Sequence, residues 1–479
     1  MQLNNEKDKM NKEPELVGSN SEKVKNIPLY IMVSMAFGDL MIEFFLAAFG
    51  SRIFDFYENE IHLSSLLVGL AFVLYAVWNM FNDPLVGYIS DKPRPSWKKY
   101  GKRFPWIVFG GLAWAVSFML LFSAPDLDPT DNWLILFLWL LISICVYDTL
   151  FSIFDTNFRG LIPEKYRSDR NRVKFSSFEV ALGVIGSVLG VILPPFLIVY
   201  GDQSSFFTMS VVVSILGVIL VLIQIPGLRE DKEAIAKEYE AQKSQERKKF
   251  FEMMRLIIRQ KNFIAYLIFY TLYQATILLF LGSIAYLNRY IIQGDETNES
   301  LIMLGYIITG LISIPIWNKI AQKYGNKRVF IAGGFIIGLL TLPFLFVSSL
   351  IGAIITASII GIGLIGFWLM QTPILADIID EAIVEQEIKF EGFYMGIRTF
   401  FGRISIIIQA LTFALIHFFT GFDPQAPALS DLAIIGLRIQ MALVPMILMI
   451  VGVLFFWKLY DLSDEKKKEI QAKLRTLKL

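Results

Sequence analysis

The sequence contains little charge and almost no cysteine or histidine. Only 18% of its 479 residues are charged, whereas 55% are hydrophobic, and its mean hydropathy is +0.56. Soluble domains carry about a quarter charged residues, so this composition excludes a water-soluble or disordered chain. The single cysteine, Cys145, excludes a disulfide framework or thiolate cluster. The two histidines, His62 and His417, argue against a zinc site, and a net charge of +1 gives no reason to expect nucleic acid.

Catalytic motifs are also absent. The chain has no G-x-S-x-G, no H-E-x-x-H and no Walker-type phosphate loop. We therefore expect neither an enzyme nor a bound cofactor. Without an ATP site, any transport must be driven by ion gradients, so the expected coupling ion is Na⁺ or H⁺.

Long apolar runs dominate what is present. A membrane-spanning helix needs about 20 apolar residues, and twelve such runs occur in two sets of six. The predicted spans are 28–50, 64–90, 104–124, 133–158, 175–200, 206–226, 261–286, 300–318, 328–348, 351–376, 392–420 and 434–458. The sequence therefore predicts an all-α, multi-pass membrane protein that contacts the lipid bilayer.

Polar stretches divide the chain. The predicted parts are a cytosolic tail over 1–27, a first six-helix bundle over 28–226, a linker helix on the cytosolic surface over 227–260, a second bundle over 261–458 and a cytosolic tail over 459–479. Residues 1–27 lack the apolar core of a signal peptide. We expect the first span to act as the insertion signal.

Basic residues in the short loops predict the orientation. Lys and Arg gather after the second, fourth and eighth spans, whereas the loops on the other side carry only Arg52 and Arg289. Cytosolic loops are enriched in these residues, so both termini are expected in the cytosol. The loop after the tenth span departs from this pattern, since it is acidic.

The two halves resemble each other. K-K-Y-G-K-R-F-P-W-I-V-F-G-G (98–111) follows the second span of the first half, and Q-K-Y-G-N-K-R-V-F-I-A-G-G (322–334) follows the second span of the second half. Parallel repeats of this kind build transporters whose site lies between the two bundles.

Ionisable residues inside the spans mark the candidate site. A charge in the hydrocarbon core costs about 3 kcal/mol or more, so these side chains must face partners or a water-filled cavity. The first half supplies acids, amides, one hydroxyl and one arginine: Asp39, Glu43, Asn79, Asn82, Asp83, Asp148, Ser152, Asp155, Arg159 and Glu179. The second half supplies Tyr273, Gln274, Trp368, Gln371, Arg398 and Arg403.

Two interpretations of these charges stay open. The carboxylates either pair with Arg159, Arg398 and Arg403 only to stabilise the fold, or form a site whose pairs break and reform. Trp368 is either a packing residue or a platform for a sugar ring. For Asp377 and Asp380 we expect a gate salt bridge or helix-end packing, and for His417 a satisfied interior position.

Several motifs resemble one known family. W-N-M-F-N-D-P-L-V-G-Y-I-S-D followed by R-x-x-W-x-x-x-G-K-R-x-P-W-I is similar to the signature of glycoside–pentoside–hexuronide:cation symporters, of which melibiose permease is the type member. The F-W-L-M-Q and A-D-I-I-D motifs around the tenth span, and N-F-R-G-L-I-P-E at the end of the fourth, also match. The resemblance covers about 28–460. It implies the major facilitator fold and cation-coupled sugar uptake in the plasma membrane.

The resemblance also implies roles for individual residues. The cation-binding carboxylate falls on Asp83 and a cation-binding hydroxyl on Ser152, with Asn79, Asn82 and Asp148 nearby. The family's second carboxylate falls on Asn79, which carries no charge, and Asp148 is our hypothetical replacement for it. Substrate-binding positions fall on Asp39, Asp155, Trp368 and Arg403, and we add Arg398 and Gln371. A span-five arginine of the family has no counterpart in F-S-S-F-E-V.

Three functions compete. The first is a symporter of a small-molecule sugar or glycoside, coupled to sodium or protons and working as a monomer. The second keeps the fold and moves a lysophospholipid or another amphiphile with sodium, with Arg398 and Arg403 holding the phosphate, which arginine suits well. The third is a membrane sensor without transport. It predicts a large additional soluble domain, for which the sequence leaves no room.

Overall fold

The computed structural model describes residues 27–90, 92, 97–166, 169–230, 259–386 and 391–476. The described residues are helical, with no strand among them, and twelve of their helical segments are long and apolar enough to cross a membrane. Six of these segments precede Arg229 and six follow Gln260, as predicted. Residues 1–26 of the predicted tail and 231–258 of the predicted linker lie outside the described residues, as do basic residues such as Arg94 and Arg167.

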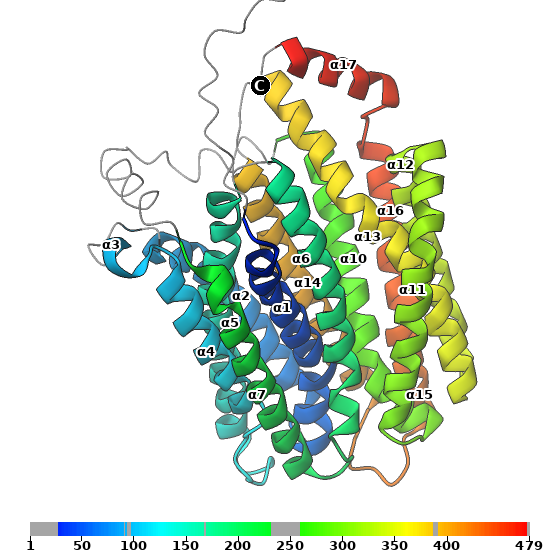
Figure 1. Ribbon diagram of the computed structural model, residues 1–479. Helices are drawn as coiled ribbons and strands as arrows, with labels where there is room; N and C mark the ends of the chain where they lie inside the picture. Colours follow the sequence, from blue (N-terminus) through cyan, green and yellow to red (C-terminus); the bar gives the residue numbers. More distant parts are fainter. Residues whose placement is uncertain are drawn as a thin grey trace, which may run out of the picture.

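The helices of the first half run along the long axis of the molecule in Figure 1. They are α1 (Leu29–Asp55), η1 (Phe56–Glu60), α2 (Ser65–Ser90), α3 (Trp97–Tyr100), α4 (Phe104–Leu121), α5 (Trp133–Lys165), α6 (Asp169–Ile192), η2 (Pro194–Phe196) and α7 (Gln203–Leu228). The short elements η1 and η2 extend or follow spans at one end of the molecule.

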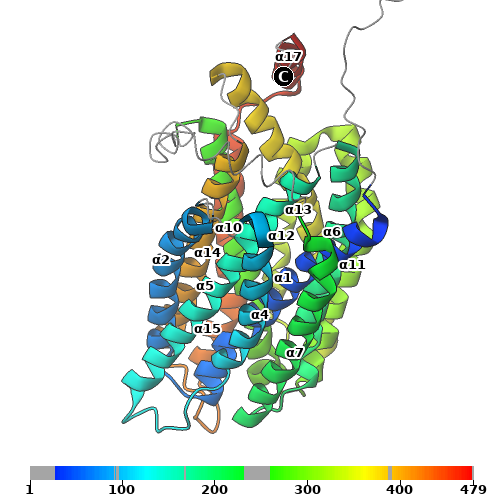
Figure 2. The ribbon, with the colours of Figure 1, turned by 60° about the vertical axis from the view of Figure 1, so that its left-hand side comes forward.

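The second half follows the same plan. Its helices are α10 (Lys261–Tyr286), η3 (Leu287–Ile292), α11 (Thr297–Tyr324), α12 (Asn326–Leu340), η4 (Leu342–Leu345), α13 (Leu350–Gln386), α14 (Glu391–Thr420), α15 (Asp431–Met441), α16 (Leu443–Leu459) and α17 (Asp464–Thr476). Both views show α17 at one end of the molecule, which we call the termini end, and α15 near the other. Figure 2 shows α17 standing beyond the ends of the spans.

Apolar side chains face both inward and outward. Phe45, Trp114 and Phe118 are fully buried between helices, with neighbouring ring centroids 4.9 and 5.3 Å apart. Phe109 and Phe346 are exposed by 74% and 82%. An outer surface this apolar suits lipid, where each helix satisfies its own backbone hydrogen bonds.

Glycines allow the closest helix contacts within the first half. A Cβ placed on Gly186 of α6 would collide with the backbone carbonyl of Leu40 in α1. Gly190, one turn later, faces the carbonyl of Phe44 in the same way. The two helices therefore pack backbone against backbone, which small residues permit in membranes.

The halves meet along α1, α2 and α6 of the first and α10, α11 and α14 of the second. The contacting pairs are α2 with α14, α1 with α10 and α6 with α11. At Gly69 of α2, α14 approaches so closely that a Cβ would lie 2.6 Å from that of Ala414. These three pairs of helices therefore form much of the interface between the halves.

The structure differs from the predicted spans at several ends. Helix α1 and η1 continue to Glu60 rather than ending near residue 50, because the chain stays helical where its charges are buried. The twelfth span contains two helices with a break at Ala442, three residues before Pro445, which cannot donate a backbone hydrogen bond. The final predicted tail contains a further helix, α17.

Candidate functional site

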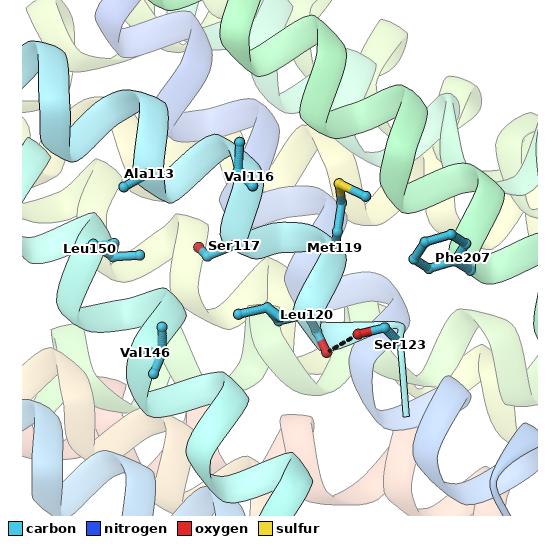
Figure 3. A pocket seen from close by; sticks show the side chains of 9 residues that line it. All are labelled: Ala113, Val116, Ser117, Met119, Leu120, Ser123, Val146, Leu150 and Phe207. Atoms are coloured by element: carbon cyan, nitrogen blue, oxygen red, sulfur yellow. Dashed lines mark hydrogen bonds between the residues drawn. The ribbon is translucent and has the colours of Figure 1, made fainter. Parts of the chain in front are cut away.

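A cavity of about 2360 Å³ lies between the halves. Helices α1, α2, α5 and α6 line it from the first half, and α10, α11, α13 and α14 from the second. A second hollow, of about 510 Å³, lies among α4, α5 and α7 and has no charged side chain in its lining (Figure 3). Because ionisable groups gather only around the first of these two, it is the candidate site.

The most buried acid of the cavity is Asp148 of α5, which is 2% exposed. Its Oδ1 accepts hydrogen bonds from Tyr75 Oη at 2.9 Å and from Asn79 Nδ2 at 2.6 Å. Asn82 Nδ2 lies 3.5 Å from Oδ2 and donates to Ser152 Oγ at 2.9 Å. A buried carboxylate is costly unless its oxygens are satisfied, and residues one turn apart on α2 provide the donors.

Asp83 connects this cluster to the second half. Its Oδ1 accepts a hydrogen bond from Ser152 Oγ at 2.5 Å, and its Oδ2 lies 3.3 Å from Nη2 of Arg403 in α14. Arg403 also lies over the ring of Phe151, 6.0 Å from its centroid. Two carboxylates and one guanidinium, from both halves, thus form one continuous polar cluster.

A second acidic cluster surrounds Arg159 of α5. Its guanidinium contacts Asp39 of α1 at 3.1 Å, Asp155 at 3.1 Å and Glu179 of α6 at 3.2 Å. Glu43, one turn after Asp39, accepts a hydrogen bond at 3.1 Å from Ser187 Oγ. Three carboxylates therefore share one guanidinium, and the Glu43 carboxyl lies next to this group on α1.

The wall from the second half is basic and aromatic. Nη2 of Arg398 donates to Oε1 of Gln371 at 2.9 Å, and the guanidinium lies over the ring of Tyr270, 4.5 Å from its centroid. No described carboxylate lies within ion-pair distance of Arg398. Trp368, on the same helix as Gln371, lines the cavity and is 43% exposed.

Another part of the lining is apolar. It comes from facing sides of α6 and α11, which pack against each other across the halves. Its residues are Val180, Val184, Val188, Val191, Ile307, Leu311 and Ile314. The cavity therefore offers charged, aromatic and aliphatic surfaces to a ligand.

Towards the end opposite the termini, the cavity is closed by aromatic rings and then by a buried polar network. Phe54 lines the cavity, stacks on Phe72 with ring centroids 4.4 Å apart, and meets Phe413 of the second half edge-to-face with centroids 4.9 Å apart. Beyond them lies what we call the seal. It consists of Arg52, Asp55, Glu58, Glu60, Tyr200, Tyr286, Arg289, Glu299 and His417.

The seal joins the halves through charged pairs. Arg52 of α1 pairs with Glu299 of α11, which also accepts a hydrogen bond from Tyr200. Arg289 of η3 lies 2.7 Å from Glu60 and 3.8 Å from Asp55. Paired arginines and carboxylates can be buried because each supplies the other's hydrogen bonds.

At the termini end, the pairs seen in the described part of the chain lie within one half. In the first half, the Glu230 carboxylate accepts backbone N–H groups of Lys102, Arg103 and Phe104 at 2.8–3.2 Å. Burial raises the pKa of the Glu230 carboxyl, although these hydrogen bonds oppose the shift. Lys165 donates to the carbonyls of Gly227 and Arg229, and burial lowers the pKa of its ammonium to about 8.

In the second half, α17 is fastened to the end of α13. Lys466 pairs with Glu381 at 2.8 Å, and Lys467 pairs with Asp377 at 2.5 Å. Glu381 is 2% exposed and also accepts from Asn262 of α10. Asp377 thus lies at a helix-end contact, one of the two roles expected for it.

The structure brings the predicted site residues together in three groups. Asn79, Asn82, Asp83, Asp148, Ser152 and Arg403 form the first, Asp39 and Asp155 the second, and Trp368, Gln371 and Arg398 the third. Asp39 and Asn82 lie behind the cavity lining, and the others line it. The roles assigned to these residues stay predictions.

Sequence reasoning missed two features. Tyr75 lies one turn before Asn79 on α2, so helical spacing could have included it. Arg52 and Arg289 were treated as loop residues, but both lie in helical segments and pair inside the seal. Nothing in their sequence neighbourhood shows their partners, which come from the other half of the chain.

The comparisons with known proteins agree with this architecture. The family model described as MFS/sugar transport protein matches residues 29–464. The solved structure of the nucleoside transporter NupG superposes with a TM-score of 0.60 over 91% of this chain and 99% of that one, at 14% identity. That likeness supports the major facilitator fold.

Curated relatives fall into two groups. The sodium-dependent lysophosphatidylcholine symporter 1 of Mus musculus is 22% identical over 84% of this chain and 79% of its own length. The lactose permease of Lactobacillus delbrueckii subsp. bulgaricus is 24% identical over 82% of this chain and 63% of its own length. The raffinose carrier protein of Pediococcus pentosaceus is 22% identical over 85% and 64%.

Proposed function

The chain belongs to the MFS/sugar transport protein family, and from this premise we propose that it carries a sugar or glycoside across the plasma membrane together with a cation. The observation that carries the proposal is the Asp83–Arg403 ion pair, which joins the two halves inside the cavity. A pair placed there connects cation binding to the relative position of the halves. The lactose and raffinose carriers among the relatives support a sugar as substrate.

The cation binds between Asp83 and Asp148. Carboxylate, hydroxyl and amide oxygens are the ligands that a hard cation prefers, and Ser152 Oγ and Asn79 Oδ1 lie beside the two acids. Asn79 Oδ1 is buried without a hydrogen-bond partner, so an acceptor is available. A cation at Asp83 competes with Arg403 and releases the second half from the first.

The substrate binds across the cavity, between the Arg159 cluster and Trp368. Asp155 accepts sugar hydroxyls while Arg159 holds the carboxylate in place, and Asp39 supports Arg159 from behind. Trp368 offers an apolar face to the ring, and Gln371 with Arg398 donates hydrogen bonds. Both halves then contact the substrate, as alternating access requires.

The conformation is closed at the seal. Basic loops place the termini end in the cytosol, so the seal lies on the outer side. In this orientation the cavity belongs to the inward-facing half of the cycle. Uptake then requires the seal to open and Asp83–Arg403 to reform once the cargo has left.

Uptake into proteoliposomes tests this function. Labelled sugars and glycosides are supplied under a sodium gradient or a proton gradient, imposed separately. We expect one gradient to drive accumulation, and Asp83→Asn to abolish accumulation in the same vesicles. The matched control is Asp126→Asn, which changes an exposed aspartate in the loop between α4 and α5. Accumulation by the Asp83→Asn variant at the normal rate would contradict the proposal.

A second function is favoured by the apolar wall between α6 and α11. A polar sugar gains little from contact with these seven aliphatic side chains. The acyl chain of an amphiphile would bury apolar surface against them. Arg398, without a carboxylate partner among the described residues, suits a phosphate headgroup. The lysophosphatidylcholine symporters among the relatives support this alternative.

One pair of variants separates the two substrates. Leu311→Gln places an amide in the apolar wall, and Trp368→Ala removes the aromatic face. If the substrate is a sugar, Trp368→Ala should reduce uptake about tenfold and Leu311→Gln only slightly, since one stacking contact is worth about 1 kcal/mol or more. The opposite ranking, measured with a labelled lysolipid, identifies the amphiphile.

A further inference from the structure

The seal contains more acid than base. The side chains of Asp55, Glu58, Glu60 and Glu299 are exposed by only 0–2%, and those of Arg52 and Arg289 by 2% and 17%. Two guanidinium groups thus face four carboxyl groups in a region away from water. Buried charges need partners of opposite sign, so the described seal lacks positive charge.

Glu58 and His417 meet where this charge is lacking. Glu58 belongs to η1 of the first half, and His417 to α14 of the second. His417 Nδ1 lies 2.7 Å from Glu58 Oε1, and both side chains are 1% exposed. Ser65 and Tyr286 also donate hydrogen bonds to Glu58. Neither residue takes part in the proposed cation or substrate sites.

The geometry fixes which ring nitrogen can gain a proton. An ionised Glu58 only accepts hydrogen bonds, so with this carboxylate we assign the hydrogen of the contact to Nδ1 of His417. Nε2 is buried and has no hydrogen-bond partner. In the neutral ring its lone pair is therefore available.

Aromatic rings surround the imidazole. The ring of His417 lies 4.5 Å from that of Phe422, 5.2 Å from Tyr286 and 5.7 Å from Phe413, measured between centroids. Aromatic faces stabilise a nearby cation. The surroundings thus accept a positive ring although Nε2 finds no oxygen.

We propose that the Glu58–His417 pair is a proton-binding site, separate from the cargo cavity, and that its protonation holds the seal closed. The proposal rests on the transporter function only in requiring that the seal opens and closes. The proton adds to Nε2, and the ring becomes an imidazolium paired with Glu58. It supplies the third cation of the seal and converts a hydrogen bond between a neutral ring and a carboxylate into an ion pair, which is stronger.

Opening of the seal breaks this pair, because its members lie on different halves. A proton that binds the closed form more tightly shifts the equilibrium towards closure by the same factor. The other ionisable groups that face the pair come from η1, α1, α10, η3, α11 and the neighbouring loops. They are Asp55, Glu60, Arg52, Tyr286, Arg289, Tyr290, Glu299, Tyr200, His62 and Asp423. Among these types only histidine ordinarily titrates between pH 5 and 8.

The chain is suited to a clean test because it contains only two histidines and one cysteine. Spin labels are attached to Thr130→Cys and Ala428→Cys in a Cys145→Ser background. Both label positions are exposed and lie in loops at the seal end, one in each half. Distances between the labels are measured by double electron–electron resonance in the full-length protein in liposomes, from pH 5.5 to pH 8.5.

Two identical substitutions form the comparison. His417→Asn keeps a donor at the position of Nδ1 but does not titrate. His62→Asn removes the other histidine, which has a φ of 58°, a conformation that asparagine also tolerates. We expect acid to raise the closed-to-open ratio of the parent protein about tenfold, a typical size for coupling between a bound ligand and a conformational change.

The His62→Asn variant should keep this change of the closed-to-open ratio with pH, which we call the pH step. The His417→Asn variant should lose it. Glu58→Gln serves as a second variant, and it should also lose the step, since no charged pair forms. A parent protein without a pH step, or a step that survives His417→Asn, would overturn the proposal. The proposed cargo is tested separately by uptake at pH 8. If the label distance responds to pH but the protein moves no sugar, only the proposed sugar transport is contradicted.

Discussion

At the seal end, side chains of opposite charge join the two halves, whereas at the termini end the ion pairs found among the described residues lie within one half. Arg52 with Glu299 and Arg289 with Glu60 cross the interface at the seal. Lys467 with Asp377 holds α17 to its own half at the other end. Between them, Asp83–Arg403 is the cross-half ion pair of the described cavity. Breakable links at one end and self-contained halves at the other allow the halves to rock as rigid bodies.

The largest effect should come from a substitution that breaks a charged pair of the seal. Arg52→Gln leaves Glu299 buried without its charge partner, which costs about 3–5 kcal/mol. The closed form should lose that stability, so the label distance at the seal end should lengthen and the melting temperature should fall.

A double variant controls for loss of the charge itself. Arg52→Met with Glu299→Leu replaces the buried pair by apolar side chains, which is often neutral or stabilising. We expect the seal of this double variant to close as it does in the parent protein. If the seal of the double variant stays as open as that of Arg52→Gln, then the attraction between Arg52 and Glu299 itself holds the seal closed, and the cost of an unpaired charge does not explain the opening.

The next effect concerns the link inside the cavity. Asp148→Asn should reduce gradient-driven uptake about 100-fold, because the amide lacks the negative charge that makes the cation bind tightly. Exchange of substrate at equilibrium should persist, since it needs no cation movement. Asn79 Nδ2 lies 2.6 Å from Asp148 Oδ1, so Asp148→Asn combined with Asn79→Asp returns the charge to nearly the same place. Uptake that the combination fails to restore would contradict the replacement hypothesis.

A smaller effect tests whether the first half is one rigid body. Gly186→Ala pushes a methyl group against the Leu40 carbonyl and should cost about 1–3 kcal/mol of stability. The matched control is Gly50→Ala on α1, where a Cβ meets nothing within 4 Å. Thermal unfolding in detergent measures both. We expect the label distance at the seal to be unchanged in both variants, and a lengthened distance would show that the half deforms.

The smallest effect lies at the termini end. Burial lowers the pKa of Lys165 to about 8 from an ordinary 10.5. Between these values the unfolded chain binds more protons than the folded one, so stability rises as pH increases from about 8 to about 10.5. The gain is about 1 kcal/mol after allowance for screening by solvent. Lys165→Met should remove it, as measured by melting temperatures at pH 7.5 and pH 10.

The sequence predicted the spans well but not the seal. Apolar runs and the six-plus-six division follow from local composition, which is why the helices lie where expected. The cavity charges were also visible, because an acid such as Asp148 in an apolar run must have a partner. Which partner it has depends on helix packing, and only the structure shows Tyr75 beside it.

Residues of the seal were hidden for a different reason. Arg52 and Glu58 lie near the expected end of a span, where charge is ordinary. Their burial depends on α10, α11 and α14, some 230 residues or more along the chain. We expected the ring nitrogens of His417 to have hydrogen-bond partners. In the structure Nδ1 has one, whereas Nε2 has none.

The mixed charge of the seal has an electrical consequence. A cation that approaches from the seal end meets buried guanidinium groups, and an anion meets buried carboxylates, so neither passes through the closed form. The aromatic layer of Phe54, Phe72 and Phe413 excludes the water that would carry protons. A membrane full of this protein in its closed form should therefore hold its voltage as well as a bare bilayer does.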